Sequence, residues 1–416
     1  MSVFVSIAAI ILGTTLLGEV AQRIGQPAVL GELLAGVLLG ASVFGIVDPH
    51  EPVVHALADL GVMVLLFEIG LHTDVRALRR VGGSALVVAA VGVIVPFLGG
   101  VGVARLFGVP AIPALVAGAA LTATSIGISA RVLSDIGKLH SPEGQIVLAA
   151  AVADDVIGLI ILSVVSSIVA GTSIDAWGVL KITAVAVGFV VGALALASRA
   201  IPPLFRVVER IRLTGALALI AFAFALLLGV LAEASGSARI IGAFAAGLIL
   251  HPTPQRAEIE RNVATLGTFL VPVFFAVVGA SVDLRALVSG PALGIGTALI
   301  VVGVLGKLAA GYAPWWFEGS KLLVGVAMIP RGEVGLIFAG MGMATGAISA
   351  GLFGALTLMV AVTTLITPPA LTRIVRTTRG PASGEFRGDG GIDDLVAGAR
   401  VESGRKTVAL KRPKPK

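Results

Sequence analysis

The stretch Ala149–Leu159, AAAVADDVIGL, places two adjacent carboxylates, Asp154 and Asp155, inside an apolar run from Ile146 to Ala170. A bilayer-spanning helix needs about 20 apolar residues at 1.5 Å each, so this run is long enough to cross a membrane. One charge at membrane depth costs at least ~2.5–3.5 kcal/mol, and ionisable groups kept there are functional by default. The pair therefore predicts an ion or proton site. The alternative is one carboxylate in a structural pair and the other facing water.

The composition around this run is that of a membrane protein. Of the 416 residues, 57% are hydrophobic and 13% are charged, against about 25% charged residues in soluble domains. The 54 glycines suit close helix packing and broken helices. There is no cysteine, which excludes disulfides and thiolate metal sites. The net charge of +6 is assigned to membrane orientation and lipid contact, not to nucleic acid.

Apolar segments predict an all-α polytopic fold with thirteen membrane spans. The N-terminal segment lacks the basic start of a cleaved signal and is interpreted as the first span. The expected spans are 2–22, 27–47, 53–71, 82–107, 111–134, 143–170, 176–201, 213–232, 237–251, 262–281, 291–313, 319–346 and 350–372.

Basic residues divide the loops into two alternating sets, which sets the orientation. The richer set holds Arg23; Arg76, Arg79 and Arg80; Arg131 and Lys138; Arg199, Arg206, Arg210 and Arg212; Arg256 and Arg261; and Lys321. The other set holds only Arg105, Lys181, Arg239 and Arg285. The richer set is expected to be cytoplasmic. In the inner (cytoplasmic) membrane this puts the N-terminus on the outer side and the C-terminus in the cytoplasm. The polar tail, 377–416, is expected to be disordered and cytoplasmic, either solvated or touching anionic lipid.

Two of the expected spans contain signals for an interrupted helix. In Leu121–Val132, Thr122, Thr124 and Ser125 can replace backbone hydrogen bonds. In Met328–Gly340, Pro330 removes a donor, and Arg331 and Glu333 carry charges in mid-span.

The two interrupted spans are seven apart in the count, and an odd offset inverts topology, as in transporters built from inverted repeats. The alternative is two unrelated kinks. The offset groups 81–171 with 291–376 as a six-helix core, and 1–75 with 213–288 as a second bundle, with 176–201 as a linker helix.

Lys307 lies in the middle of the apolar span Leu293–Tyr312, where a lone ammonium is unfavourable. Pairing with Asp154 or Asp155 removes the problem for both partners, and a purely structural ion pair is the alternative. The other carboxylate can then bind a hard cation, helped by the hydroxyls of Thr124 and Ser125, or a proton. Competition of the two ligands, combined with alternating access, produces antiport. Arg331 and Glu333 are expected to neutralise the second break, with direct ion binding as the alternative.

No GxxxxGK[ST] loop is present, so ATP drive is unsupported, and the pattern indicates a transporter that is not an enzyme and needs no cofactor. Three functions remain open: sodium/proton exchange, potassium/proton exchange by the same fold, and a channel or a transport-dead sensor.

At AAAVADDVIGL, LTATSIGISARVL (121–133), GKLAAGY (306–312) and MIPRGEVGLI (328–337), the chain resembles the cation/proton antiporter superfamily. It is most similar to the bacterial electrogenic sodium/proton antiporters of the NapA type, from Met1 to about Arg376. The resemblance implies a homodimer in which the core moves like an elevator against the dimer bundle.

The resemblance also implies roles for single residues. Asp155 would be the main carrier of sodium (or lithium) and of the proton, and Asp154 would make and break an ion pair with Lys307. Thr124 and Ser125 would lie where the broken helices cross. Electroneutral relatives have asparagine at the position of Asp154, and potassium-efflux relatives have glutamine there and a nucleotide-binding domain. The aspartate thus implies exchange of two protons for each sodium ion.

Overall fold

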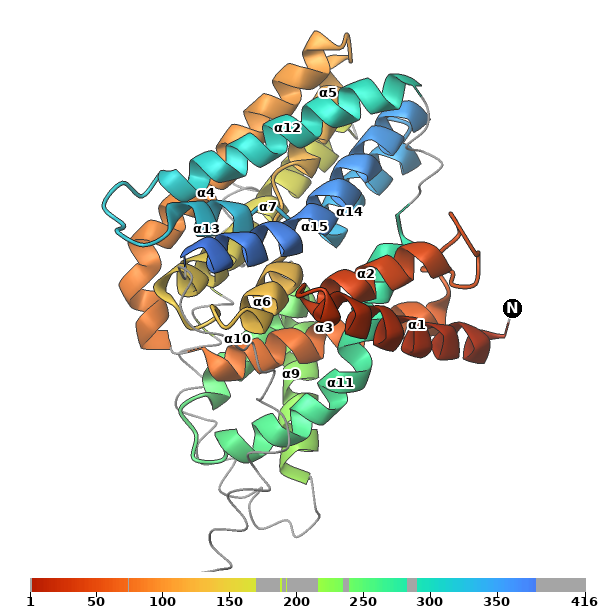
Figure 1. Ribbon diagram of the computed structural model, residues 1–416. Coiled ribbons are helices and arrows are strands. Elements are labelled where there is room, and N and C mark those ends of the chain that lie inside the picture. Colours follow the sequence, from red (N-terminus) through yellow and green to blue (C-terminus); the bar gives the residue numbers. More distant parts are fainter. Residues whose placement is uncertain are drawn as a thin grey trace, which may run out of the picture. The chain divides into compact units, whose positions relative to one another are not determined.

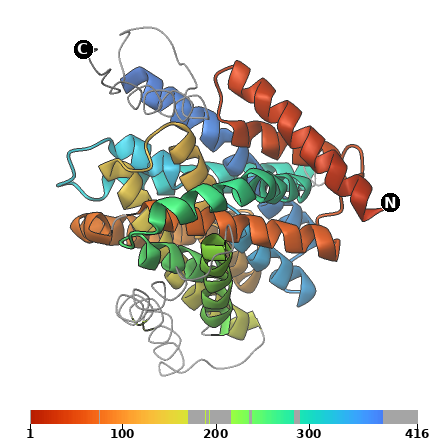
Figure 2. The same cartoon turned by 90° about the horizontal axis from the view of Figure 1, so that it is seen from below.

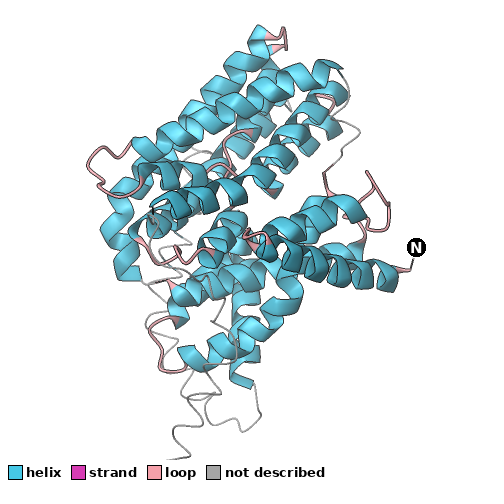
Figure 3. Cartoon of the chain, viewed as in Figure 1, coloured by secondary structure: helices cyan, strands magenta, loops and turns pink. Residues whose placement is uncertain are grey.

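The structure is a computed structural model that describes residues 2–73, 75–169, 216–234, 239–282 and 290–378, together with the isolated positions 188 and 192. Over these ranges the chain is helical, and they contain no strand (Figure 3). Eight of the described helices are long and apolar enough to cross a membrane, judged by length and composition. The all-α expectation is confirmed at this level. The count of thirteen spans stays a prediction, since the expected span 176–201 lies outside the described residues, as does the tail beyond Thr378.

One set of helices packs together from both halves of the sequence (Figure 1). It consists of α1 (Val3–Arg23), α2 (Ala28–Leu39), α3 (Pro52–His72), α9 (Ala216–Ala234), α10 (Arg239–Leu250) and α11 (Arg256–Ala280). Glycine allows the helices to touch backbone to backbone. A Cβ built on Gly36 of α2 would lie 2.0 Å from the carbonyl oxygen of Ala276 in α11. These helices come from the segments 1–75 and 213–288, and their assignment to a separate dimer bundle stays a prediction.

Helix α1 lies at the outer edge of this set (Figure 2). It exposes large apolar side chains, among them Phe4, Leu12 and Leu16, each more than 60% accessible. A face of this kind suits lipid or a second protein surface.

Helix α2 is shorter than the expected span 27–47, because the helix ends at Leu39. Gly40 is extended there, and a Cβ on it would lie 2.8 Å from the Cα of Ala280. The chain then turns through Gly45 at φ +62°, a backbone conformation that favours glycine.

The remaining helices form a second set (Figure 1). It consists of α4 (Val75–Leu106), α5 (Ala111–Ala120), α7 (Pro142–Val169), α12 (Gly290–Tyr312), α13 (Lys321–Ala327), α14 (Glu333–Ala344) and α15 (Ala350–Thr378). Helix α4 packs on α5, α7 and α12, and a buried apolar cluster joins α5, α12, α14 and α15. Helix α6 (Ile126–Asp135) is counted with this second set because it packs on α7, and it also touches α2 and α3 of the first set.

Both predicted interruptions are present in the structure. The expected span 111–134 is divided into α5 and α6 by residues 121–125, and the expected span 319–346 into α13 and α14 by residues 328–332. In the first break the hydroxyl of Thr122 donates back to the carbonyl of Ala119, 2.7 Å away, and so satisfies one carbonyl at the end of α5. In the second break Pro330 offers no N–H.

Candidate ion-binding site at the two helix breaks

The two breaks are hydrogen-bonded to each other across about 200 residues of sequence. The N–H of Ser125 donates to the carbonyl of Pro330 at 2.8 Å. The hydroxyl of Thr124 donates to the carbonyl of Met328 at 3.2 Å. Irregular backbone at membrane depth is tolerated only when protein or a cavity surrounds it, and here each break supplies partners for the other.

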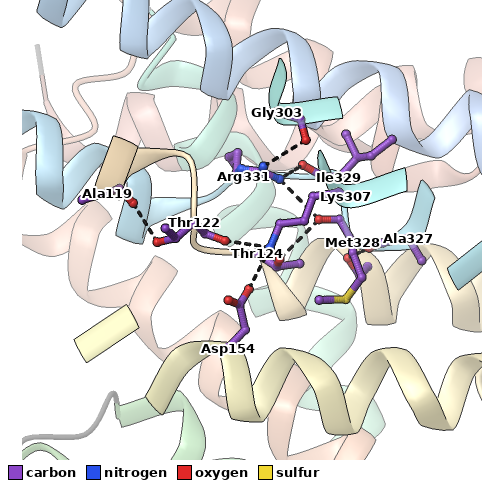
Figure 4. A network of polar contacts seen from close by, with 11 residues as sticks. Ala119, Thr122, Thr124, Asp154, Gly303, Lys307, Ala327, Met328, Ile329 and Arg331 are labelled. Atoms are coloured by element: carbon purple, nitrogen blue, oxygen red, sulfur yellow. Dashed lines mark hydrogen bonds and ion pairs between the residues drawn. The ribbon is translucent and has the colours of Figure 1, made fainter. Parts of the chain in front are cut away.

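Lys307 reaches the first break from α12 and is fully buried. Its ammonium nitrogen lies 3.2 Å from Oδ2 of Asp154 and 2.7 Å from the carbonyl oxygen of Thr122 (Figure 4). That carbonyl lies at the C-terminal end of α5, where the helix dipole is negative. The ammonium thus neutralises a carboxylate and a helix end at once.

The two aspartates lie on α7 beside this lysine. Asp154 is 0% exposed and Asp155 is 6% exposed. Within the described part of the chain, Oδ1 of Asp154 has no hydrogen-bond partner, so its ion pair with Lys307 is its main compensation. Asp155 also acts electrostatically on Lys307. Adjacent helical residues point about 100° apart, so the two carboxylates have different surroundings although they share one helix turn.

Arg331 closes the second break and is also fully buried. Its guanidinium donates to the carbonyls of Met328 (3.3 Å), Ile329 and Gly303 (3.5 Å), as Figure 4 shows. The first two follow the last residue of α13, so the guanidinium satisfies carbonyls that the interrupted helix leaves without partners. These contacts suit the neutralisation of a helix end, one of the two roles expected for Arg331, and the role itself stays a prediction.

The structure brings seven of the nine residues singled out in the sequence into one connected region, and the other two adjoin it. Hydrogen bonds and one ion pair connect the seven, which are Thr122, Thr124, Ser125, Asp154, Lys307, Pro330 and Arg331. Asp155 adjoins Asp154. Glu333 begins α14, and its side chain lies outside the described residues.

Two further polar side chains belong to the region, and sequence reasoning missed them. Ser129 of α6 donates to the carbonyl of Ala327 at 2.6 Å, and Thr364 of α15 donates to the carbonyl of Arg331. Ser129 is four residues after Ser125, on the same helix face, which is a signal that periodicity could have used. Thr364 is one of several threonines in the same span, and nothing in the surrounding sequence distinguishes it from the others.

A cavity of about 410 Å³ extends between the two sets of helices toward this region. Its lining includes Gly332 of the second break and Thr364. It also includes His55, Asp59 and Arg239, the last two joined by an ion pair of 3.0 Å. Most of the other lining residues are apolar. The cavity therefore gives small ligands a space next to the second helix break.

Comparison with known proteins places this geometry in a family. The chain is 40% identical to the high-affinity Na(+)/H(+) antiporter NhaS3 of Synechocystis sp., over 89% of each chain. It is 34% identical to the Na(+)/H(+)-K(+) antiporter GerN of Bacillus cereus, over 88% of this chain and 95% of that one.

A solved structure of the sodium proton antiporter MjNhaP1 from Methanocaldococcus jannaschii shares the fold, with a TM-score of 0.70. The sequence identity is 17%, and the match covers 92% of this chain and all of the other. The model of the family described as "Sodium/hydrogen exchanger, transmembrane" matches residues 7–377. With buried charges meeting at two hydrogen-bonded helix breaks and this match over most of its length, the chain belongs to the transmembrane sodium/hydrogen exchanger family.

Proposed function

We propose that this protein exchanges Na⁺ (or Li⁺) for H⁺ across the cytoplasmic membrane, with both ions competing for the carboxylate of Asp155. The relatives NhaS3 and GerN are described as antiporters of Na⁺ and H⁺. The observation that carries the proposal is the arrangement of four ionisable side chains, Asp154, Asp155, Lys307 and Arg331, each at most 6% exposed, beside the two breaks.

The charge balance of these four groups explains why the ligands compete. With both aspartates ionised, two carboxylates balance one ammonium and one guanidinium. One Na⁺ or one H⁺ at Asp155 adds a single positive charge, and both together would add two. In a medium of low dielectric constant the second charge is strongly unfavourable. One carboxylate therefore holds one ligand at a time.

The first break offers further oxygen ligands for a cation. The hydroxyl of Thr124 donates its proton to Met328, which leaves its oxygen lone pairs free to accept a cation. Ser125 precedes the first residue of α6 and has a second hydroxyl. Hydroxyl and carboxylate oxygens are the ligands that hard cations prefer.

Alternating access follows from the division into two sets of helices. In this proposal 81–171 and 291–376 form a core that moves against the dimer bundle 1–75 and 213–288, with 176–201 as linker, in a homodimer. The N-terminus lies outside and the C-terminus in the cytoplasm. The apolar cavity between the two sets is the space that such a movement opens and closes.

The transport is electrogenic in this proposal, with two protons entering for each sodium leaving. The second proton is linked to the pair of Asp154 and Lys307. When the pair breaks, the ammonium and the carboxylate lose their mutual stabilisation, so a proton moves on or off.

Exchange of K⁺ for H⁺ is a second candidate, since GerN is named as a Na(+)/H(+)-K(+) antiporter. Proteoliposomes with an internal pH dye separate the two candidates. Sodium pulses that dissipate an imposed pH gradient support the first, and a response to potassium alone supports the second. Cation currents that ignore the proton gradient would indicate a channel.

The decisive variant is Asp155→Asn, which keeps the size of the side chain and removes its charge. We expect exchange to be lost while the purified protein keeps its elution profile and melting temperature. Asp48→Asn, at an exposed carboxylate in the loop before α3, is the control and should retain exchange. Normal exchange by Asp155→Asn would show that another group carries the ions.

A further inference from the structure

A second charge cluster, in which Glu32 is buried and the other members are partly accessible, joins the two sets of helices away from the breaks. Arg131 of α6 lies 3.2 Å (Nε) from Oδ1 of Asp135 on the same helix. Its Nη2 lies 3.9 Å from Oε1 of Glu32 on α2. Glu68 of α3 acts electrostatically on the same guanidinium. The guanidinium of Arg131 thus interacts electrostatically with three carboxyl groups, which come from three helices.

Glu32 is the most enclosed member of this cluster. It is 5% exposed, and within the described residues its Oε2 has no hydrogen-bond partner. An ion pair at 3.9 Å is too long for a hydrogen bond, so the carboxyl is buried with little direct compensation. Three ionised carboxylates around one guanidinium leave a net charge of two negatives, and Glu32 is the carboxylate with the least access to water. That excess is relieved when one carboxyl, and Glu32 first, binds a proton.

Several charged groups of the helices packed on α2 and α3 pair with one another. On α1, Arg23 and Glu19 pair with each other at 2.8 Å on the exposed surface. On α11, Glu260 contacts Arg256 (3.6 Å) and His72 (3.4 Å). Glu260 also adds negative charge near Glu68. None of these contacts supplies a positive charge to Glu32.

We propose that Glu32 is a second proton-binding group, which ties α6 to α2 through Arg131 when ionised and releases it when protonated. This rests on the proposed function, because α6 directly follows the first break and would move with it relative to α2. The ligand is a proton and not a metal cation. A metal ion bound to Glu32 would keep its positive charge next to the guanidinium of Arg131, whereas a bound proton turns the carboxylate into an uncharged carboxylic acid. Glu32 is then a positioning residue that sets how easily the first break moves.

Infrared difference spectroscopy between acidic and alkaline pH tests the proton directly, without transport. The protein carries Asp155→Asn, so that the transport site does not contribute its own signal. We expect the C=O band of a protonated carboxyl that disappears in Glu32→Gln, shifts in Glu32→Asp and persists in Asp135→Asn. A band that ignores both Glu32 substitutions, or that vanishes with Asp135→Asn, would overturn the assignment whether or not the protein transports sodium.

Transport kinetics test the coupling to α6. In proteoliposomes, Glu32→Gln should change the maximal rate and its pH dependence while the sodium KM stays within about twofold, because Glu32 does not touch the cation. Glu19→Gln, at an exposed ion-paired carboxylate, is the matched control and should retain the wild-type profile. Arg131→Gln should give the same altered profile as Glu32→Gln, and the double variant should add nothing further. An unchanged pH profile in Glu32→Gln, or additive effects in the double variant, would refute the coupling of Glu32 to α6. If Glu32→Gln does not fold, the same measurements on Glu32→Asp test the coupling.

Discussion

At the scale of single residues, the site depends on how buried charges are compensated. Lys307 compensates both the carboxylate of Asp154 and the carbonyl of Thr122, and all three groups are inaccessible to water. A buried ion pair adds little net stability compared with apolar residues, but removal of one partner leaves an isolated charge. This asymmetry gives a direct test of the pair.

Lys307→Ala should lower the free energy of unfolding by ~3–5 kcal/mol, because Asp154 loses its main compensation. The double variant Lys307→Ala/Asp154→Asn should recover part of that loss, since the amide carries no charge. The melting temperatures of the three proteins in detergent check this order. A single variant as stable as the wild type, or a double variant less stable than Lys307→Ala alone, would argue against the pair.

At the scale of elements, the two breaks stabilise each other because each supplies what the other lacks. The end of α5 is neutralised by an ammonium from α12, whereas the end of α13 is neutralised by Arg331 from within its own break. The two extended segments lie so close that a Cβ on Gly332 would stand 2.8 Å from Oγ of Ser125. Glycine is therefore required at this position by close approach.

Gly332→Ala should reduce both stability and exchange, because the added methyl group forces the two breaks apart. Gly340→Ala on α14 is the matched control, since no atom lies within 4 Å of the Cβ position there. That control should be neutral or stabilising by up to ~1 kcal/mol, the usual gain of alanine over glycine inside a helix. Melting temperature and proteoliposome exchange measure both variants, and equal behaviour of the two would contradict the close approach.

At the scale of the whole molecule, the site lies where two sets of helices meet, and each set draws on both halves of the sequence. The inter-set cavity approaches the second break, while Glu32 and Arg131 bridge the sets at another place. A movement between the sets would alter access to the aspartates and the bridge together. In the proposed mechanism, competition for Asp155 sets the main pH response, and Glu32 modulates it.

Exchange should fall as the pH is lowered, because protons occupy the carboxylate that sodium needs. A tenfold increase in sodium should move the midpoint of this fall toward acid by up to ~1 pH unit, since a tenfold change in either ligand is worth about 1.4 kcal/mol. Initial rates across a pH series at two sodium concentrations measure this shift. A flat profile, or a midpoint that ignores sodium, would exclude simple competition.

Three features could be predicted from the sequence alone: the membrane class, the two helix interruptions and the charged residues within the spans. Hydrophobic run length, Pro330, the threonines from Thr122 onward and the cost of charge at membrane depth are local properties, so they can be read without coordinates. The boundaries were less accurate where packing decides them: α2 ends at Leu39 because Gly40 meets the backbone of α11.

The contacts between charged side chains of different helices could be seen only in the folded protein. Two carboxylates were open as partners of Lys307, and the register of α7 against α12 places Asp154 there. The contacts of Arg331 with helix-end carbonyls, and the bridge from Glu32 to Arg131, join segments that no local pattern connects. The physical reason is that run length and propensity act along the chain, whereas compensation of a buried charge depends on which helices pack together.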